Sequence, residues 1–182
     1  MSKVYVFMAD GTEEVEALTV IDLLRRAKVN VVTVSVMQEK KIISSHNIGI
    51  ETDELYGESD YMDGDMIVLP GGMPGTTHLK NHEALRKVLF SYKDAGKYLA
   101  AICAAPSVYG WNGMLIGKRA TCYPGFEEEL KGAVATGEGV VTDGQFITSK
   151  GLGTAIDFSL ELITLLVNAE TAENIAKAVQ YK

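Results

Sequence analysis

The sequence predicts an α/β sandwich built around a mostly parallel sheet, and three observations carry this prediction. Short apolar runs that suit buried strands alternate along the chain with longer segments of helical periodicity. A helix lies between the first two strands, which implies parallel strands and a right-handed crossover. The chain has no internal repeat, low-complexity tract or linker, so we expect one domain over residues 1–182.

The first half of the chain contains three short, apolar segments that suit buried strands, at residues 4–8, 30–36 and 65–69. Residues 41–56 carry smaller apolar pieces, which predict a hairpin or edge excursion. Residues 82–95 have helical periodicity. The first half therefore supplies parallel strands and the helices that cover them.

A helix is predicted directly after the first strand. Asp10 and Glu13 have the spacing of a capping box at its start. Its predicted apolar face comprises four residues, Val15, Leu18, Ile21 and Leu24. We expect this face to pack against the sheet.

The second half has a predicted strand at residues 98–102, and a helix begins near Pro106. Asp143-Gly144 joins the apolar segments 139–142 and 145–148, which indicates a β-hairpin. Weaker patterns predict short helices at residues 126–131 and 170–178 and a longer one that opens at Gly151-Leu-Gly-Thr154.

The composition is that of an ordinary globular protein, with 47% hydrophobic and 23% charged residues. The net charge of −7 argues against stable binding to nucleic acid or to an anionic membrane. No apolar run approaches a membrane span, and the N-terminal run is too short for a signal peptide, so we expect a cytoplasmic protein. Two cysteines do not form a disulfide framework, and the three histidines show no zinc-ligand spacing with them.

Cys103 is placed where a predicted strand ends and a helix begins. Small residues flank it, and Pro106 suits the first turn of the helix. Such a turn presents a nucleophile in hydrolases of the G-x-S-x-G type. The start of a helix favours the thiolate, so we expect a lowered pKa for Cys103. The alternative is that Cys103 is a small buried hydrophobe, which is the usual role of a cysteine after an apolar run.

Three loops that follow parallel strands carry chemistry-bearing residues: 13–16, Gly71-Gly72 and Cys103-Ala104. In such sheets, ligands bind beyond the carboxyl ends of the strands. If Glu16 points toward Cys103, burial and a neighbouring thiolate would raise its pKa and keep it protonated, so that it could act as a general acid or base. The alternative is a solvated first turn. The N–H groups of Gly72 and Ala104 are candidates for an oxyanion hole.

Two segments of this sequence partly match motifs for nucleotide cofactors, but neither motif is complete. The segment from Gly113 to Lys118 is one residue short of a P-loop, and Gly151-x-Gly153 lacks the third glycine of a dinucleotide site. We therefore expect no cofactor.

Four segments together resemble the ThiJ/PfpI superfamily, in order and over essentially the whole chain. They are Ala-Asp-Gly-Thr-Glu-Glu-Val-Glu (9–16), Ile-Val-Leu-Pro-Gly-Gly (67–72), Ala-Ala-Ile-Cys-Ala-Ala-Pro (100–106) and Thr-Ser-Lys-Gly-Leu-Gly-Thr-Ala (148–155). Within the superfamily they are similar to the branch of the parkinsonism-associated deglycase and bacterial YajL. The resemblance implies a flavodoxin-like three-layer sandwich, similar to class I glutamine amidotransferases, and a homodimer.

The same resemblance implies roles for individual residues. Cys103 would be the nucleophile and the oxidation-prone thiol, Glu16 its protonated partner, and Gly72 and Ala104 the backbone donors. Ala104 stands where protease-like members have His, so a peptidase is not expected. Tyr123 stands where a related deglycase has His, and Tyr123 and Gly71 are candidate substrate contacts.

Two functions are compatible with this constellation. In the first, Cys103 and Glu16 convert small 2-oxoaldehydes such as methylglyoxal or glyoxal, or their early adducts with thiols and amines, into hydroxy acids without a cofactor. In the second, the protein is an oxidative-stress sensor or chaperone-like protein whose Cys103 is oxidised without turnover.

Overall fold

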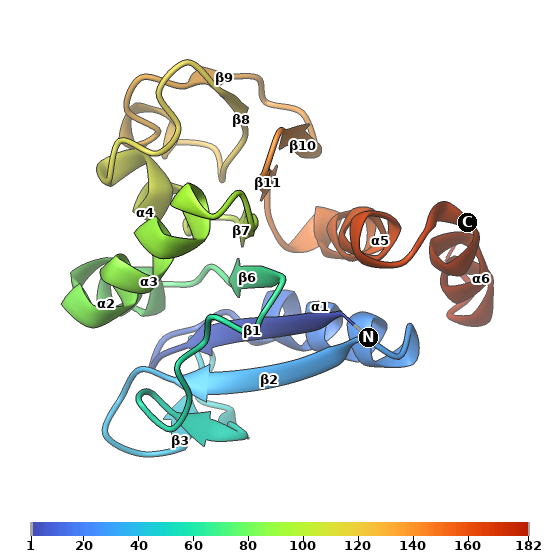
Figure 1. The fold of residues 1–182 in the computed structure, drawn as a ribbon, viewed down its shortest axis with the longest axis horizontal. Helices are drawn as coiled ribbons and strands as arrows, with labels where there is room; N and C mark the ends of the chain where they lie inside the picture. Colours follow the sequence, from blue (N-terminus) through green and yellow to red (C-terminus); the bar gives the residue numbers. More distant parts are fainter. Residues whose placement is uncertain (1, 182) are drawn as a thin grey trace.

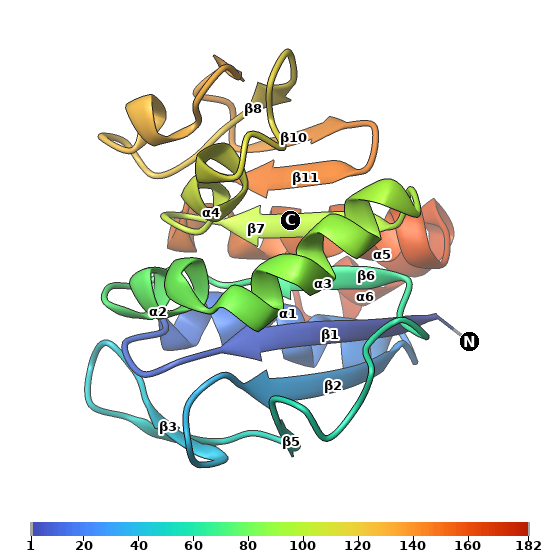
Figure 2. The ribbon, with the colours of Figure 1, turned by 60° about the vertical axis from the view of Figure 1, so that its left-hand side comes forward.

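A computed structural model describes residues 2–181. Its central sheet has seven strands in the order β10-β11-β7-β6-β1-β2-β5. The strands are β1 (Lys3–Met8), β2 (Asn30–Ser35), β5 (Glu54–Leu55), β6 (Met66–Leu69), β7 (Tyr98–Ile102), β10 (Val140–Asp143) and β11 (Phe146–Ser149). Only the pairing of β10 with β11 is antiparallel; the other neighbours in this sheet are parallel. The predicted α/β sandwich is confirmed (Figure 1, Figure 2).

Helices cover both faces of the sheet (Figure 1). One face carries α1 (Glu14–Arg26), α5 (Ala155–Leu166) and α6 (Ala169–Ala178), and the other carries α2 (Gly75–Asn81), α3 (Glu83–Asp94) and α4 (Pro106–Trp111). Strand β1 shows why two cores form. Val4, Val6 and Met8 pack on the first face, whereas Tyr5 and Phe7 pack on the second.

Shorter elements decorate this sandwich. A hairpin of β3 (Lys41–Ile43) and β4 (Gly49–Glu51) confirms the excursion predicted within residues 41–56. Two short parallel strands, β8 (Arg119–Ala120) and β9 (Val134–Ala135), pair outside the main sheet. Single 3₁₀ turns form η1 (Glu127–Glu129) and η2 (Leu152–Thr154). None of the described helices is long and apolar enough to cross a membrane.

The buried face of α1 differs from the prediction. Val15 and Leu18 are 43% and 44% exposed, whereas Ala17 and Val20 are buried together with Ile21 and Leu24. The predicted residues are spaced by three, so each successive one drifts about 60° around a helix of 3.6 residues per turn. The observed spacing of 17, 20, 21 and 24 stays on one face, and small Ala17 gave only a weak apolar signal.

The start of α1 also differs from the predicted capping box. Asp10 does not cap the helix, because its Oδ1 accepts a hydrogen bond from the N–H of Ile43 at 2.7 Å. Glu13 is the N-cap, and its Oε2 accepts from the N–H of Glu16 at 2.6 Å. This cap fixes the backbone at Glu16, which is a candidate site residue.

Candidate active site

Cys103 occupies the turn between β7 and α4, as the sequence predicts. Its φ of +65° lies in the left-handed region, which few non-glycine residues adopt. Two backbone hydrogen bonds hold this conformation: the N–H of Cys103 donates to the Ser149 carbonyl at 2.9 Å, and the N–H of Tyr123 donates to the Cys103 carbonyl at 2.8 Å. Cys103 is half-buried, whereas the other cysteine, Cys122, is buried.

Glu16 lies against this sulfur, although it is only 1% exposed. Its side chain interacts with that of Cys103, which lowers the pKa of the acid. Its Oε2 accepts from the N–H of Gly71 at 3.0 Å, and the N–H of Leu152 also stabilises the charge of the same carboxylate. Four chain segments therefore meet at one acid, so Glu16 is a buried, specifically held group rather than a solvated first turn of α1.

Glycine at position 71 is required by this close approach. A Cβ on Gly71 would lie 2.5 Å from Cβ of Cys103 and 2.6 Å from Oε2 of Glu16. Gly71, the predicted substrate contact, donates its N–H to Oε2 of Glu16 in this structure. The N–H groups of Gly72 and Ala104 both act to lower the pKa of Cys103, so they lie near enough to stabilise negative charge at the sulfur. They lie where the sequence places the two oxyanion donors.

Burial raises the pKa of both the acid and the thiol, and Glu16 raises that of Cys103 further, whereas the contact with Cys103 lowers that of Glu16. Burial, followed by repulsion from Glu13, raises the pKa of Glu16 to about 7. Burial, followed by the negative charge of Glu16, raises the pKa of Cys103 to about 12. The predicted lowering of the thiol pKa is therefore wrong. The six-residue helix α4 and two N–H donors are outweighed by desolvation and by the neighbouring carboxylate.

The pair thus retains a proton at neutral pH, and only one of its members is charged at a time. Protonation of Glu16 removes the repulsion that holds the thiol neutral. A proton that moves from sulfur to the carboxylate therefore creates the thiolate without adding a second charge to the site. A carboxylate with a pKa near 7 is suited to this transfer at neutral pH.

Tyr123 lies at the rim of the site and is 51% exposed. It lines a shallow pocket of about 290 Å³ together with Pro124, Gly151 and Leu152. A Cβ on Gly151 would lie 3.9 Å from Oε1 of Glu16, so this pocket borders the acid. The sequence did not single out Leu152, because a backbone donor leaves no signature in residue type.

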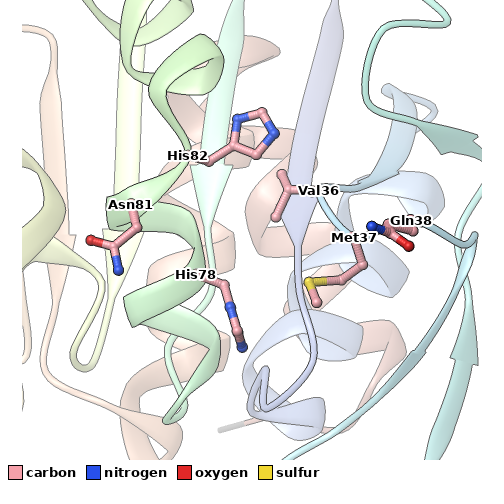
Figure 3. A pocket seen from close by; sticks show the side chains of 6 residues that line it. All are labelled: Val36, Met37, Gln38, His78, Asn81 and His82. Atoms are coloured by element: carbon pink, nitrogen blue, oxygen red, sulfur yellow. The ribbon is translucent and has the colours of Figure 1, made fainter.

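A separate pocket of about 370 Å³ lies beside the end of β2, between residues 36–38 and helix α2 (Figure 3). His78 and His82 face Met37 across it in the close-up view. Nδ1 of His82 accepts from the N–H of Leu85 at 3.0 Å, so this histidine caps α3. The pocket contains none of the predicted site residues.

Three ligand-type side chains gather at the start of α1. Atoms of Glu13, Glu14 and His46 lie within 4.8 Å of one another, so this part of the described chain could hold a metal ion. Nδ1 of His46 already pairs with Oε1 of Glu14 at 2.8 Å, and Glu13 caps the helix. Both carboxylates are thereby engaged within the protein.

Fold and site together define a flavodoxin-like protein that presents a cysteine beside a buried acid. The chain belongs to the DJ-1/PfpI family, whose model matches residues 2–165. It is 39% identical to DJ-1 homolog B of Arabidopsis thaliana over 96% of this chain and 40% of that protein. It is 36% identical to DJ-1alpha of Drosophila melanogaster over 96% of this chain and 82% of that protein. The chain spans less than half the length of the two Arabidopsis homologs that it matches.

Solved structures agree with this assignment. Oxidized Toxoplasma gondii DJ-1 superimposes with a TM-score of 0.96 at 36% sequence identity, covering 100% of this chain and 99% of that one. The family also contains enzymes: isonitrile hydratase of Pseudomonas putida is 33% identical over 64% of this chain and 52% of that protein. The predicted family and fold are therefore confirmed.

Proposed function

We propose that this protein is a cysteine-dependent enzyme that converts small 2-oxoaldehydes, or their early adducts with thiols and amines, into hydroxy acids. The observation that carries the proposal is the contact between Cys103 and Glu16, with the N–H groups of Gly72 and Ala104 at the sulfur. A nucleophile, a base that titrates near neutrality and two fixed donors are the parts that carbonyl chemistry requires. None of these parts needs a cofactor.

In the proposed reaction, the Glu16 carboxylate takes the thiol proton while sulfur attacks the aldehyde carbon of methylglyoxal. The resulting oxyanion accepts hydrogen bonds from Gly72 and Ala104 and is protonated to a hemithioacetal. Glu16 then moves the proton on this carbon to the neighbouring carbonyl carbon, which gives a thioester of a hydroxy acid. Water hydrolyses the thioester, releases lactate and returns the thiol, so the sum is methylglyoxal plus water giving lactate.

The first experiment is lactate formation from methylglyoxal in the absence of glutathione. We compare the wild type with Cys103→Ala and Cys122→Ala, which are the same substitution at the two cysteines of the chain. Turnover should be lost in Cys103→Ala and retained per folded molecule in Cys122→Ala. Absence of turnover by a wild type whose thiols are confirmed to be reduced would contradict the proposal.

A second function is favoured by the accessibility of Cys103. The thiol is half-buried, and a sulfinate formed there would be held by Glu16 and the same N–H groups. This arrangement suits an oxidative-stress sensor or a chaperone-like protein that works without turnover. Treatment with peroxide followed by intact mass and peptide mapping tests it: Cys103 should gain two oxygens first, and earlier oxidation of Cys122 would contradict the sensor.

We propose that the protein forms a homodimer. Val15 and Leu18 on α1 are exposed apolar residues, and Ile43 and Ile48 of the neighbouring hairpin region are exposed as well. The N–H of Gly11, just before α1, donates to the Ile43 carbonyl at 2.7 Å, so the two segments lie side by side. Sedimentation of the wild type and of Leu18→Glu should give a dimer and a monomer, respectively; a monomeric wild type would contradict the dimer.

A further inference from the structure

A second pocket opens beside the candidate active site, between α2, α4 and η1. It measures about 350 Å³, and its walls include Met73, Thr76, Lys80 and Ser107. Met73 follows the donor Gly72, and the hydroxyl of Ser107 donates to the carbonyl of the other donor, Ala104, at 2.6 Å. The segments that hold the sulfur therefore continue directly into the walls of this pocket.

Thr76 carries an unused polar group. The residue is 3% exposed, and its Oγ1 has no hydrogen-bond partner among the described residues. A buried hydroxyl without a partner destabilises the folded protein, so a ligand that pairs with it would recover this cost. Thr77, which is half-buried, makes no side-chain hydrogen bond within the described chain either and lines the same pocket.

Lys80 supplies positive charge on the same side of α2. It lies four residues after Thr76, so the two side chains project from one face of the helix. Nζ of Lys80 lies 3.5 Å from the centre of the Trp111 ring and 3.9 Å from Oε2 of Glu129, which is too long for a hydrogen bond. Its N–H groups make no hydrogen bond within the described chain, although they lie between this ring and this carboxylate.

The charge around Trp111 favours an anion. Nζ of Lys131 also lies on this ring, 3.4 Å from its centre, while the indole N–H donates to the carboxylate of Glu129. Two cations therefore face one carboxylate, that of Glu129, which also lines the pocket and is already engaged by the indole N–H. Burial lowers the pKa of Lys80, the charge of Glu129 raises it and that of Lys131 lowers it, so a bound anion would favour the charged lysine.

We propose that the pocket formed by Thr76, Thr77 and Lys80 binds an anionic group, a carboxylate or a phosphate, carried by the molecule that reacts at Cys103. Lys80 pairs with the charge, and the two threonine hydroxyls donate hydrogen bonds to its oxygens. The link to the reacting molecule rests on the proposed function, whereas the anion site itself does not. The substrates favoured by this site are 2-oxoaldehydes with an acidic tail rather than neutral methylglyoxal.

Direct binding is tested first, with inorganic phosphate as the probe and without any reaction. Trp111 is the single tryptophan of the chain, so its fluorescence reports on Lys80 and the pocket. Saturable binding should weaken about fivefold or more in Thr76→Val, which keeps the shape and the lysine but removes the hydroxyl. Lys87→Met, which removes an exposed lysine on α3, is the matched control and should bind as the wild type does. Absence of saturable binding, or equal binding by Thr76→Val, overturns the site.

Substrate preference is tested second, by comparing methylglyoxal with 4,5-dioxopentanoate and hydroxypyruvaldehyde phosphate. The KM of an acidic substrate divided by that of methylglyoxal should rise about tenfold in Lys80→Met and stay constant in Lys87→Met. The substrate with the lower KM tells whether the site takes a carboxylate or a phosphate. An unchanged ratio in an active enzyme overturns this inference alone. If the wild type turns over no oxoaldehyde, the proposed function fails and phosphate binding decides the anion site.

Discussion

The two cysteines of the chain show how the surroundings of a thiol decide its chemistry. Cys122 is 4% exposed, and burial raises its pKa to about 11; Cys103 is half-buried, and burial raises its pKa to about 12. The two thiols are thus similar in their reluctance to ionise. They differ in their neighbours: the buried Glu16 and the N–H groups of Gly72 and Ala104 act on Cys103, whereas Glu127 and the N–H group of Phe126 act on Cys122.

A low thiol pKa is therefore not what distinguishes the candidate nucleophile. The acid that acts on Cys122 is Glu127, whose charge raises the thiol pKa. Glu16 can take a proton at neutral pH, since its own pKa is about 7. We therefore attribute the reactivity of Cys103 to Glu16, which can accept the thiol proton.

The largest expected effect is the loss of this proton acceptor. Glu16→Gln keeps the size of the side chain but cannot accept the thiol proton, so kcat/KM for 2-oxoaldehydes should fall by about 10²–10⁴-fold. The comparison is with Cys122→Ala, measured at equal folded concentration. Retention of activity by Glu16→Gln would show that Cys103 ionises without the acid.

The next effect concerns the spacing of the thiol and the acid. Gly71→Ala places a methyl group against both Cys103 and Glu16, and it should lower kcat/KM by at least tenfold and stability by about 1–3 kcal/mol. Gly153→Ala is the matched control, because nothing lies within 4 Å of a Cβ there. Equal activity of the two variants would mean that the site tolerates a displaced acid.

The pH dependence of turnover should follow Glu16 rather than the thiol. The base is active when ionised, so kcat/KM should rise about tenfold per pH unit below pH 7 and level off above it. The high pKa of Cys103 predicts no fall in activity from pH 7 to 9. A profile that is flat from pH 5 to 8 would contradict the role of the acid as a base.

The sequence predicts the elements that have strong local signals. Pro106 and the apolar strand before it locate Cys103 correctly, and Asp143-Gly144 locates the hairpin of β10 and β11. Helix α2 was missed, because Gly75-Thr76-Thr77 has poor helix propensity and the segment is held by tertiary packing. Gly11, for example, lies so close that a Cβ there would be 2.4 Å from the Pro74 ring.

The candidate site was likewise predicted in part from the sequence and missed in part. The sequence places Cys103, Glu16, Gly72 and Ala104 at one edge of the sheet, since parallel strands end together there. The direction of the thiol pKa was wrong because it depends on how deeply the pair is buried, and burial is a property of the packed structure. Leu152 was missed because its contribution is a backbone N–H.

The smallest expected effect is on stability, and it separates Glu16 from Cys122. The pKa of Glu16 is raised from 4.5 to about 7 on folding, so the folded state binds more protons than the unfolded state between these values. The free energy of unfolding therefore falls as pH rises through this window, by up to about 3 kcal/mol from this group. Glu16→Gln should be more stable than the wild type at pH 8, and this advantage should shrink as pH falls toward 4.5.

Urea denaturation of Glu16→Gln, Cys122→Ala and the wild type at pH 4.5, 6 and 8 measures this difference. The difference between Cys122→Ala and the wild type should not change with pH, because the Cys122 thiol stays neutral throughout the range. A stability difference for Glu16→Gln that is constant from pH 4.5 to 8 would mean that the acid ionises in the folded protein as easily as in water. In that case Glu16 would have no advantage over a solvated carboxylate as the partner of Cys103, and the contrast between the two cysteines would rest on the N–H donors alone.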